Sequence, residues 1–226
     1  FPTAPVRMRE TSHGQHTVLR DNSPAYYHFE NENVRRDHSG FTWFHSTLSG
    51  LSDTNHSFSF NIPNVDTSHE QTLNITVQGD RIDSSGLLYR ASMSVNGITV
   101  LDKESWTNPN SYKTFSNSAN FLRAGTNNAV LTIHRTSSAT VYLDYFGIEY
   151  YKKLKKENIP LHFRTHSQDQ HRTVKYQIEG NHADLLAFEI RDTHQVNHLP
   201  IEDTQINNNV GFEITGRWLS SYIIIK

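Results

Sequence analysis

Several short stretches of the chain alternate hydrophobic with polar residues, so that every second side chain is apolar. The alternation is regular in 57–62, 73–77 and 91–95. Two further stretches, 129–133 and 140–150, are rich in aliphatic, β-branched and aromatic residues. A period of two places one set of side chains on the buried face of a β-strand and the other set in solvent. The pattern therefore predicts an all-β protein.

The pair Asn96-Gly97 separates two apolar segments, 91–95 and 98–101. Both residues tolerate a positive φ, which a two-residue hairpin turn of type I′ requires. We therefore expect two antiparallel strands joined at this pair.

Further along the chain, the pattern divides into two parts. Strands spaced by roughly 8–12 residues over 26–151 favour an antiparallel, jelly-roll-like β-sandwich. Residues 152–226 are expected to form a smaller β unit that packs on the first, because about 70 residues bury little apolar area alone. Residues 1–25 are expected to be an N-terminal extension. The apolar run 223–225 predicts a strand buried on both faces, which would lean on something beyond the chain end.

Composition excludes several classes of function but does not identify the function itself. The net charge is -2, from 21 Lys and Arg against 23 Asp and Glu, which gives no reason to expect nucleic acid as a partner. No apolar run is long enough to cross a bilayer. Cysteine is absent, which excludes a cysteine nucleophile, a thiolate metal site and disulfides. Residue types alone leave Ser/His/Asp catalysis open, although no Gly-x-Ser-x-Gly motif occurs.

Five segments, in this order, resemble the β-sandwich region of gingipain-like cysteine peptidases, which include the sortase of the type IX secretion system. They are Tyr-Tyr-His-Phe-Glu-Asn-Glu at 26–32, Ser-Gly-Phe-Thr-Trp-Phe at 39–44, Phe-Ser-Phe-Asn-Ile-Pro-Asn at 58–64, Val-Tyr-Leu-Asp-Tyr-Phe-Gly-Ile-Glu-Tyr at 141–150, and the string 178–192. The resemblance implies a secreted or outer-membrane-associated bacterial surface protein. In that family the catalytic Cys and His lie in a downstream α/β domain, so the resemblance implies no catalytic residue here.

One loop carries candidate binding residues for a carbohydrate. Trp106 is followed by Asn108, Asn110 and Tyr112. An exposed aromatic ring beside amide side chains supplies the flat apolar face and the hydrogen bonds that a sugar needs. The alternative is a loop aromatic that folds over the edge of the sandwich or packs on the second unit.

Metal binding is not expected. The 14 histidines are scattered, and pairs four apart in a strand are roughly 13 Å apart. Asp144 lies between Leu143 and Tyr145, and simple alternation places it on the face of Tyr142 and Phe146. We favour a loop-capping carboxylate there over a calcium or sugar ligand. Asp80, Asp83, Ser84 and Ser85 form an oxygen-rich segment that could hold calcium.

Together these patterns predict a non-catalytic β-sandwich module of a secreted or surface protein. Its expected partners are neighbouring domains or other surface and secretion proteins, to which it would be a structural or docking unit. The alternative function is a carbohydrate-binding module that uses the loop around Trp106.

Overall fold

The structure is a computed structural model of the 226-residue chain. It describes residues 17–31, 33–35, 43–48, 53–79, 89–107, 111–134, 140–156, 159–169, 172–180, 184–192, 195–206, 209–217 and 220–225. The oxygen-rich segment at 80–85 lies outside the described residues.

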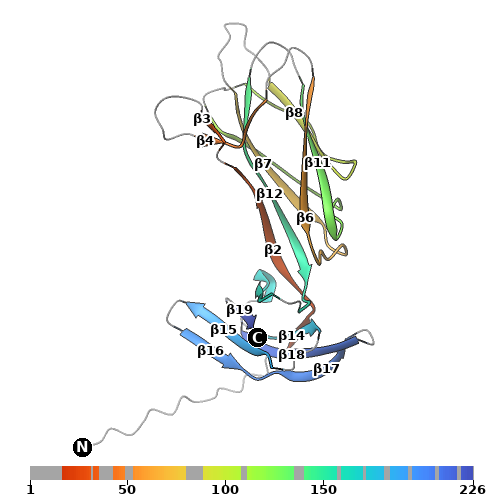
Figure 1. Cartoon of the computed structure of the whole chain (residues 1–226), viewed down its shortest axis with the longest axis vertical. Coiled ribbons are helices and arrows are strands. Elements are labelled where there is room, and N and C mark those ends of the chain that lie inside the picture. Colours follow the sequence, from red (N-terminus) through yellow and green to blue (C-terminus); the bar gives the residue numbers. More distant parts are fainter. Residues whose placement is uncertain are drawn as a thin grey trace, which may run out of the picture. The chain divides into compact units, whose positions relative to one another are not determined.

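The chain folds into two compact units, each with its own hydrophobic core (Figure 1). The larger unit comprises residues 24–153. The smaller unit combines 154–226 with the segment up to Ser23. Part of the expected N-terminal extension is therefore strand β1 (Val18–Arg20), which pairs with a strand of the smaller unit.

The larger unit is an antiparallel β-sandwich, which confirms the predicted fold class. Its long strands are β2 (Asn22–Phe29), β6 (Thr54–Ile62), β7 (Gln71–Gly79), β8 (Tyr89–Val95), β9 (Ile98–Trp106), β10 (Lys113–Ala119), β11 (Gly125–His134) and β12 (Val141–Lys153). The short strands are β3 (Val34–Arg35), β4 (Trp43–Phe44) and β5 (Ser46–Leu48).

The sheet order is that of a jelly roll. One sheet runs β10-β7-β12-β2, with β5 also paired to β12, and the other runs β6-β11-β8-β9. Numbering the long strands from one in chain order gives sheets 6-3-8-1 and 2-7-4-5, the pattern of two sheets linked by Greek-key connections. Inward residues of both sheets, among them Ile75, Met93, Leu131 and Phe146, form one core.

The predicted hairpin is confirmed. β8 and β9 pair antiparallel and are joined by Asn96 and Gly97, which have φ angles of 52° and 83°. Two positive φ angles in succession give the turn the twist that the flanking strands need.

The smaller unit consists of two four-stranded sheets. Its strands, besides β1, are β13 (Leu161–Arg164), β14 (Thr173–Glu179), β15 (Leu186–Asp192), β16 (Gln195–Leu199), β17 (Glu202–Ile206), β18 (Asn209–Arg217) and β19 (Ser221–Ile225), with a short 3₁₀ helix η1 (Ser167–Asp169). The orders are β1-β14-β18-β17 and β13-β19-β15-β16. The β1–β14 pair is parallel.

Strand β19 alternates where the sequence predicted burial on both faces. Tyr222 and Ile224 are 1% and 0% exposed and belong to the core. Ile223 and Ile225 point to the opposite face and are half-buried. The prediction of a doubly buried strand is therefore wrong for the chain by itself, because no described layer fully covers the outer side of this sheet.

Candidate functional site

Trp106 does not lie in an exposed loop. It is the last residue of β9 and is 5% exposed, with its ring stacked on Tyr89 at 5.1 Å and tilted against Phe115 at 5.7 Å. The expectation of an exposed Trp106 is wrong because the strand pairing continues to Tyr89, the partner of Trp106.

Of the remaining residues of the expected sugar platform around Trp106, the structure describes Tyr112. Asn108 and Asn110 lie outside the described residues. Tyr112 is 49% exposed, with its ring 5.9 Å from that of Phe44. The alternative was a loop aromatic that folds over the sandwich edge or packs on the second unit. The structure instead places Trp106 in a strand, with its indole in the core of the larger unit.

Asp144 sits at a β-bulge. The pairing of β12 with β7 shifts register between Leu143 and Tyr145, so Asp144 is an extra residue in its strand. Leu143 and Phe146 consequently both enter the core, which contradicts the alternation that placed Phe146 on the face of Asp144. The carboxyl group is half-buried, and its burial, together with nearby Glu30, raises its pKa.

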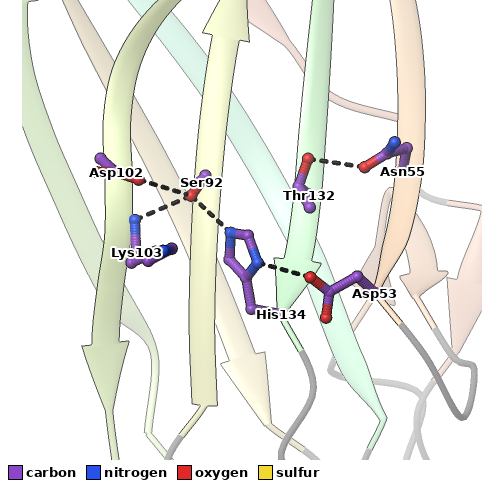
Figure 2. A network of polar contacts seen from close by, with 7 residues as sticks. All are labelled: Asp53, Asn55, Ser92, Asp102, Lys103, Thr132 and His134. Carbon is purple, nitrogen blue, oxygen red and sulfur yellow. Dashed lines mark hydrogen bonds and ion pairs between the residues drawn. The ribbon is translucent and has the colours of Figure 1, made fainter.

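A polar network on the outer face of the sheet β6-β11-β8-β9 joins Ser92, His134 and Asp53 (Figure 2). Ser92 Oγ is 2.7 Å from His134 Nε2, and His134 Nδ1 is 3.0 Å from Asp53 Oδ2. This is the order of a Ser-His-Asp relay. Sequence reasoning missed it because the three residues are distant in the chain and meet through strand register.

A second hydrogen bond of Ser92, with the backbone of Lys103, gives this serine a structural role. The register of β8 with β9 shifts between Ala91 and Met93, where Asp102 and Lys103 together oppose Ser92. Lys103 has a φ of 53°, and its N–H donates to Ser92 Oγ at 2.9 Å. The serine thus satisfies a donor that the bulge removes from the ladder.

Acyl transfer has a second requirement besides these two hydrogen bonds. An oxyanion needs N–H donors aimed beside the nucleophile. The backbone N–H bonded here, that of Lys103, is directed at Oγ itself. The geometry therefore favours a hydrogen-bonded support for the bulge over a catalytic centre.

The smaller unit carries an apolar sheet face directed away from its core. We call this surface the outer apolar face. It lies on β15, β16 and β19 of the sheet β13-β19-β15-β16 and consists of Leu186, Phe188, Ile190, Val196, Ile223 and Ile225.

Strand register brings these side chains together. Phe188 pairs with Ile223, Leu186 with Ile225, and Ile190 with Val196. Their neighbours in sequence, such as Ala187 and Ile224, point inward to the core. Leu186 and Val196 are 45% and 56% exposed, whereas the other four are half-buried. The apolar side chains are therefore contiguous, and two exposed histidines flank them, His198 opposite Phe188 and His162 opposite Ile223.

Over several strands of the larger unit the outward side chains have the opposite, polar character. The side chains that point outward from β7 and β10 are Thr72, Asn74, Thr76, Thr114, Ser116 and Ser118. Those from β6, β8 and β11 include Asn55, Ser57, Ser92, Ser94 and Thr132. An antiparallel sheet with one solvated face has this composition. The contrast singles out the outer apolar face.

The described part of the chain holds neither a metal-binding cluster nor a membrane-spanning helix. No group of three or more histidine, aspartate or glutamate side chains there is placed to hold a metal ion. No helix within the described ranges combines the length and apolar character needed to span a bilayer.

The fold has a close counterpart among solved structures. Dimeric latent PorU from Porphyromonas gingivalis superposes on 92% of this chain with a TM-score of 0.71 and 15% sequence identity. The chain has the fold of part of PorU. It spans 20% of the length of that protein. PorU is a gingipain-like sortase of type IX secretion, so the predicted resemblance is confirmed at the level of the fold.

Other structural likenesses are weaker. The CBM36-1 domain of a xylanase from the hindgut metagenome of Trinervitermes trinervoides matches 55% of this chain, and 96% of that domain, with 11% identity and a TM-score of 0.40. A family 35 carbohydrate-binding module from Clostridium thermocellum matches 55% of this chain, and 90% of that module, with 15% identity and a TM-score of 0.36. Scores at this level carry no argument about this chain. No protein-family model and no curated relative matches the sequence.

Proposed function

We propose that the chain is a non-catalytic β-sandwich module of a secreted or cell-surface bacterial protein, in which it is a structural and docking unit. The observation that carries the proposal is the outer apolar face. Contiguous exposed apolar surface on a soluble domain typically marks a site where another protein surface binds. The occupant would be a neighbouring domain or a partner protein of the surface complex.

The likeness to PorU supports two parts of this proposal, the presence of neighbouring domains and the location at the cell surface. A chain that has the fold of one fifth of a large type IX secretion protein is expected to work beside further domains. Export and attachment at the outer membrane are part of the proposal, and the same likeness supports them. The absence of cysteine excludes the peptidase chemistry of gingipain-like enzymes within this chain.

Hydroxyl-radical footprinting tests the docking surface. The purified chain and the same chain displayed on its native bacterium are oxidised in parallel, and labelling of Leu186, Phe188 and Val196 is quantified by mass spectrometry. We expect these side chains to be labelled in the purified chain and at least fivefold protected on the cell. Ile98 is a matched control, because it is 43% exposed in the larger unit and should be labelled in both samples.

Equal labelling of the outer apolar face in both samples would overturn the docking role. Protection of Ile98 to the same degree would show general shielding by the cell surface instead of a specific partner. A charged double variant, Leu186→Glu with Val196→Glu, should abolish the protection while the purified chain stays folded, because both side chains lie on the outer side of the sheet.

A further inference from the structure

A second surface, on the larger unit, combines exposed aromatic rings with polar side chains. It is the outer face of the sheet β10-β7-β12-β2. We call this surface the tyrosine face and define it by Tyr26, His28, Asn74, Tyr145 and Glu149. Tyr26 and His28 alternate along β2 with Tyr27 and Phe29, which pack on the core.

Strand register places the polar groups in cross-strand rows. One row runs Ser118–Thr72–Glu149, and the next runs Ser116–Asn74–Gly147. Asn74 Nδ2 donates to Glu149 Oε1 at 3.3 Å, and the Thr72 and Ser118 hydroxyls are 2.8 Å apart. The result is a shallow surface of hydroxyl, amide and carboxylate groups beside the aromatic rings.

Gly147 determines how Tyr26 lies. A Cβ at position 147 would overlap the Tyr26 hydroxyl and come within 2.5 Å of its Cζ. The phenol ring therefore rests on the backbone of β12, in the space that a side chain would fill. Tyr26 is nevertheless 49% exposed, so much of the ring stays accessible to solvent.

Further aromatic groups continue the surface from Tyr26. The ring of His28 is 6.0 Å from that of Tyr26 and 4.9 Å from that of Tyr145. Together the three rings form an aromatic strip whose polar neighbours lie within the same sheet. Glu149 lies close enough to Tyr26 that its charge, after burial and Tyr145, raises the pKa of the phenol.

We infer that the tyrosine face binds a neutral saccharide. A pyranose ring has a flat patch of C–H groups and a rim of hydroxyls. Tyrosine matches the flat patch with an apolar ring that carries its own polar tip. The Asn74 amide and the Glu149 carboxylate supply donors and acceptors for the rim, and a few such groups fix the orientation of a ligand.

Charge selects among sugars. Glu149 belongs to the face, and Glu30 lies beside His28, with Glu30 Oε2 2.6 Å from His28 Nε2. Asp144 lies near both, because burial and the charge of Glu30 raise the pKa of its carboxyl group while His28 lowers it. Carboxylates on and beside the face repel uronic acids and sulfated sugars. The ligand class is therefore a neutral oligosaccharide.

A neutral-glycan array followed by calorimetry with the best-bound oligosaccharide tests the inference on the full chain. We expect Tyr26→Ala to weaken binding at least tenfold and Tyr112→Ala to change it less than twofold. Tyr112 is the matched control, since both tyrosines are 49% exposed and Tyr112 belongs to the other, loop-based sugar site considered for this chain. Thermal denaturation confirms that each variant is folded.

Asn74→Ala provides a second variant in case Tyr26→Ala does not fold, and it should weaken binding severalfold. Tyr26→Phe keeps the ring on Gly147 and should retain most of the affinity. An array with no neutral glycan bound by the folded chain would overturn the inference. Loss of binding with Tyr112→Ala but not with Tyr26→Ala would also overturn it. Neither result bears on the outer apolar face, which lies on the other unit.

Discussion

At the scale of single residues, tyrosine rings occupy the space that three glycines leave open. In each case a Cβ on the glycine would come within 3.0 Å of ring atoms of the tyrosine. The pairs are Gly79 with Tyr89, Gly147 with Tyr26, and Gly216 with Tyr222. Two of these tyrosines are buried, whereas Tyr26 is half exposed. A tyrosine ring packed on a glycine thus contributes to the core at two positions, and at Gly147 it leaves an aromatic ring accessible to solvent.

Trp106 belongs to the core at this scale, and its variants should behave accordingly. We expect Trp106→Ala to lower the free energy of unfolding by about 3–5 kcal/mol, because it removes a large ring packed on Tyr89 and Phe115. Urea denaturation of the chain measures this. Tyr112→Ala, at an exposed position, should cost less than about 1 kcal/mol.

A Trp106→Ala variant with near-native stability would contradict the packing. Near-native stability together with a loss of glycan binding would instead support a sugar-binding role for Trp106, as its sequence neighbours suggested.

At the scale of secondary-structure elements, side-chain hydrogen bonds hold β1 in the smaller unit, in addition to its backbone pairing with β14. Arg20 donates through Nε to Asp169 Oδ2 at 2.9 Å and through Nη2 to Asp169 Oδ1 at 2.7 Å. The side chain of Asp169 is fully buried on η1, and that of Arg20 is 26% exposed. A two-bond contact between a buried carboxylate and an arginine is among the stronger polar contacts in proteins.

This contact should make the smaller unit sensitive to acid. The hydrogen bond from Arg20 holds the pKa of Asp169 below its ordinary value, against the opposing effect of burial. A carboxyl group whose pKa is lower in the folded state stabilises the fold above the ordinary value of about 3.9, and this stability is lost as the pH falls through the lowered pKa. We therefore expect the amides of β14 to lose protection, relative to their intrinsic exchange rates, below pH 4.

The variant Asp169→Asn separates this effect from general acid unfolding. It should cost about 3 kcal/mol at pH 7, since it leaves Arg20 without its partner, and it should flatten the pH dependence of β14 exchange. The same pH dependence in the variant as in the wild type would mean that other carboxyl groups cause it. Hydrogen exchange with mass spectrometry reports β14 separately from the larger unit.

At the scale of the whole molecule, the smaller unit is assembled from two distant parts of the chain. Leu154 N–H donates to the Asp21 carbonyl at 2.7 Å, and the Ser23 hydroxyl donates to the Arg164 carbonyl at 2.9 Å. The buried His166 ring is hydrogen-bonded to the Asn22 carbonyl at 3.0 Å. The larger unit, in contrast, is one continuous segment.

Fragments should therefore behave differently. Residues 24–153 contain a complete jelly roll and should fold alone with a cooperative thermal transition. Residues 154–226 alone should not fold cooperatively, because β14 would lose β1 and the backbone partners at 21–23. Adding a peptide of residues 17–23 should restore part of the structure, as circular dichroism and amide NMR dispersion would show.

A folded 154–226 fragment without the peptide would contradict this dependence. The separate prediction that the smaller unit packs on the larger one stays a prediction, and proteolysis at the lysines of 152–156 would test it.

Much of the fold could be predicted because alternation is a local property. Alternation directly predicts which side chains of β6, β7 and β8 face the core, and the pair Asn96-Gly97 predicts the turn between β8 and β9. Prediction failed where a bulge changes the phase. Asp144 reverses the faces in β12, where one extra residue decides the phase and no local composition reveals it. Prediction also failed at the end of β9, where pairing with β8 continues to Trp106 and places in a strand a residue that was expected in a loop.

The sequence by itself determined the all-β class, the β8–β9 hairpin and the absence of thiol chemistry, since each depends on residue type and short-range order. Only the tertiary structure decided which residues meet. Ser92 reaches His134, Tyr26 covers Gly147, and Phe188 joins Ile223 through strand register. Register depends on the pairing of strands far apart in the chain, so the outer apolar face and the tyrosine face exist only once the sheets have formed.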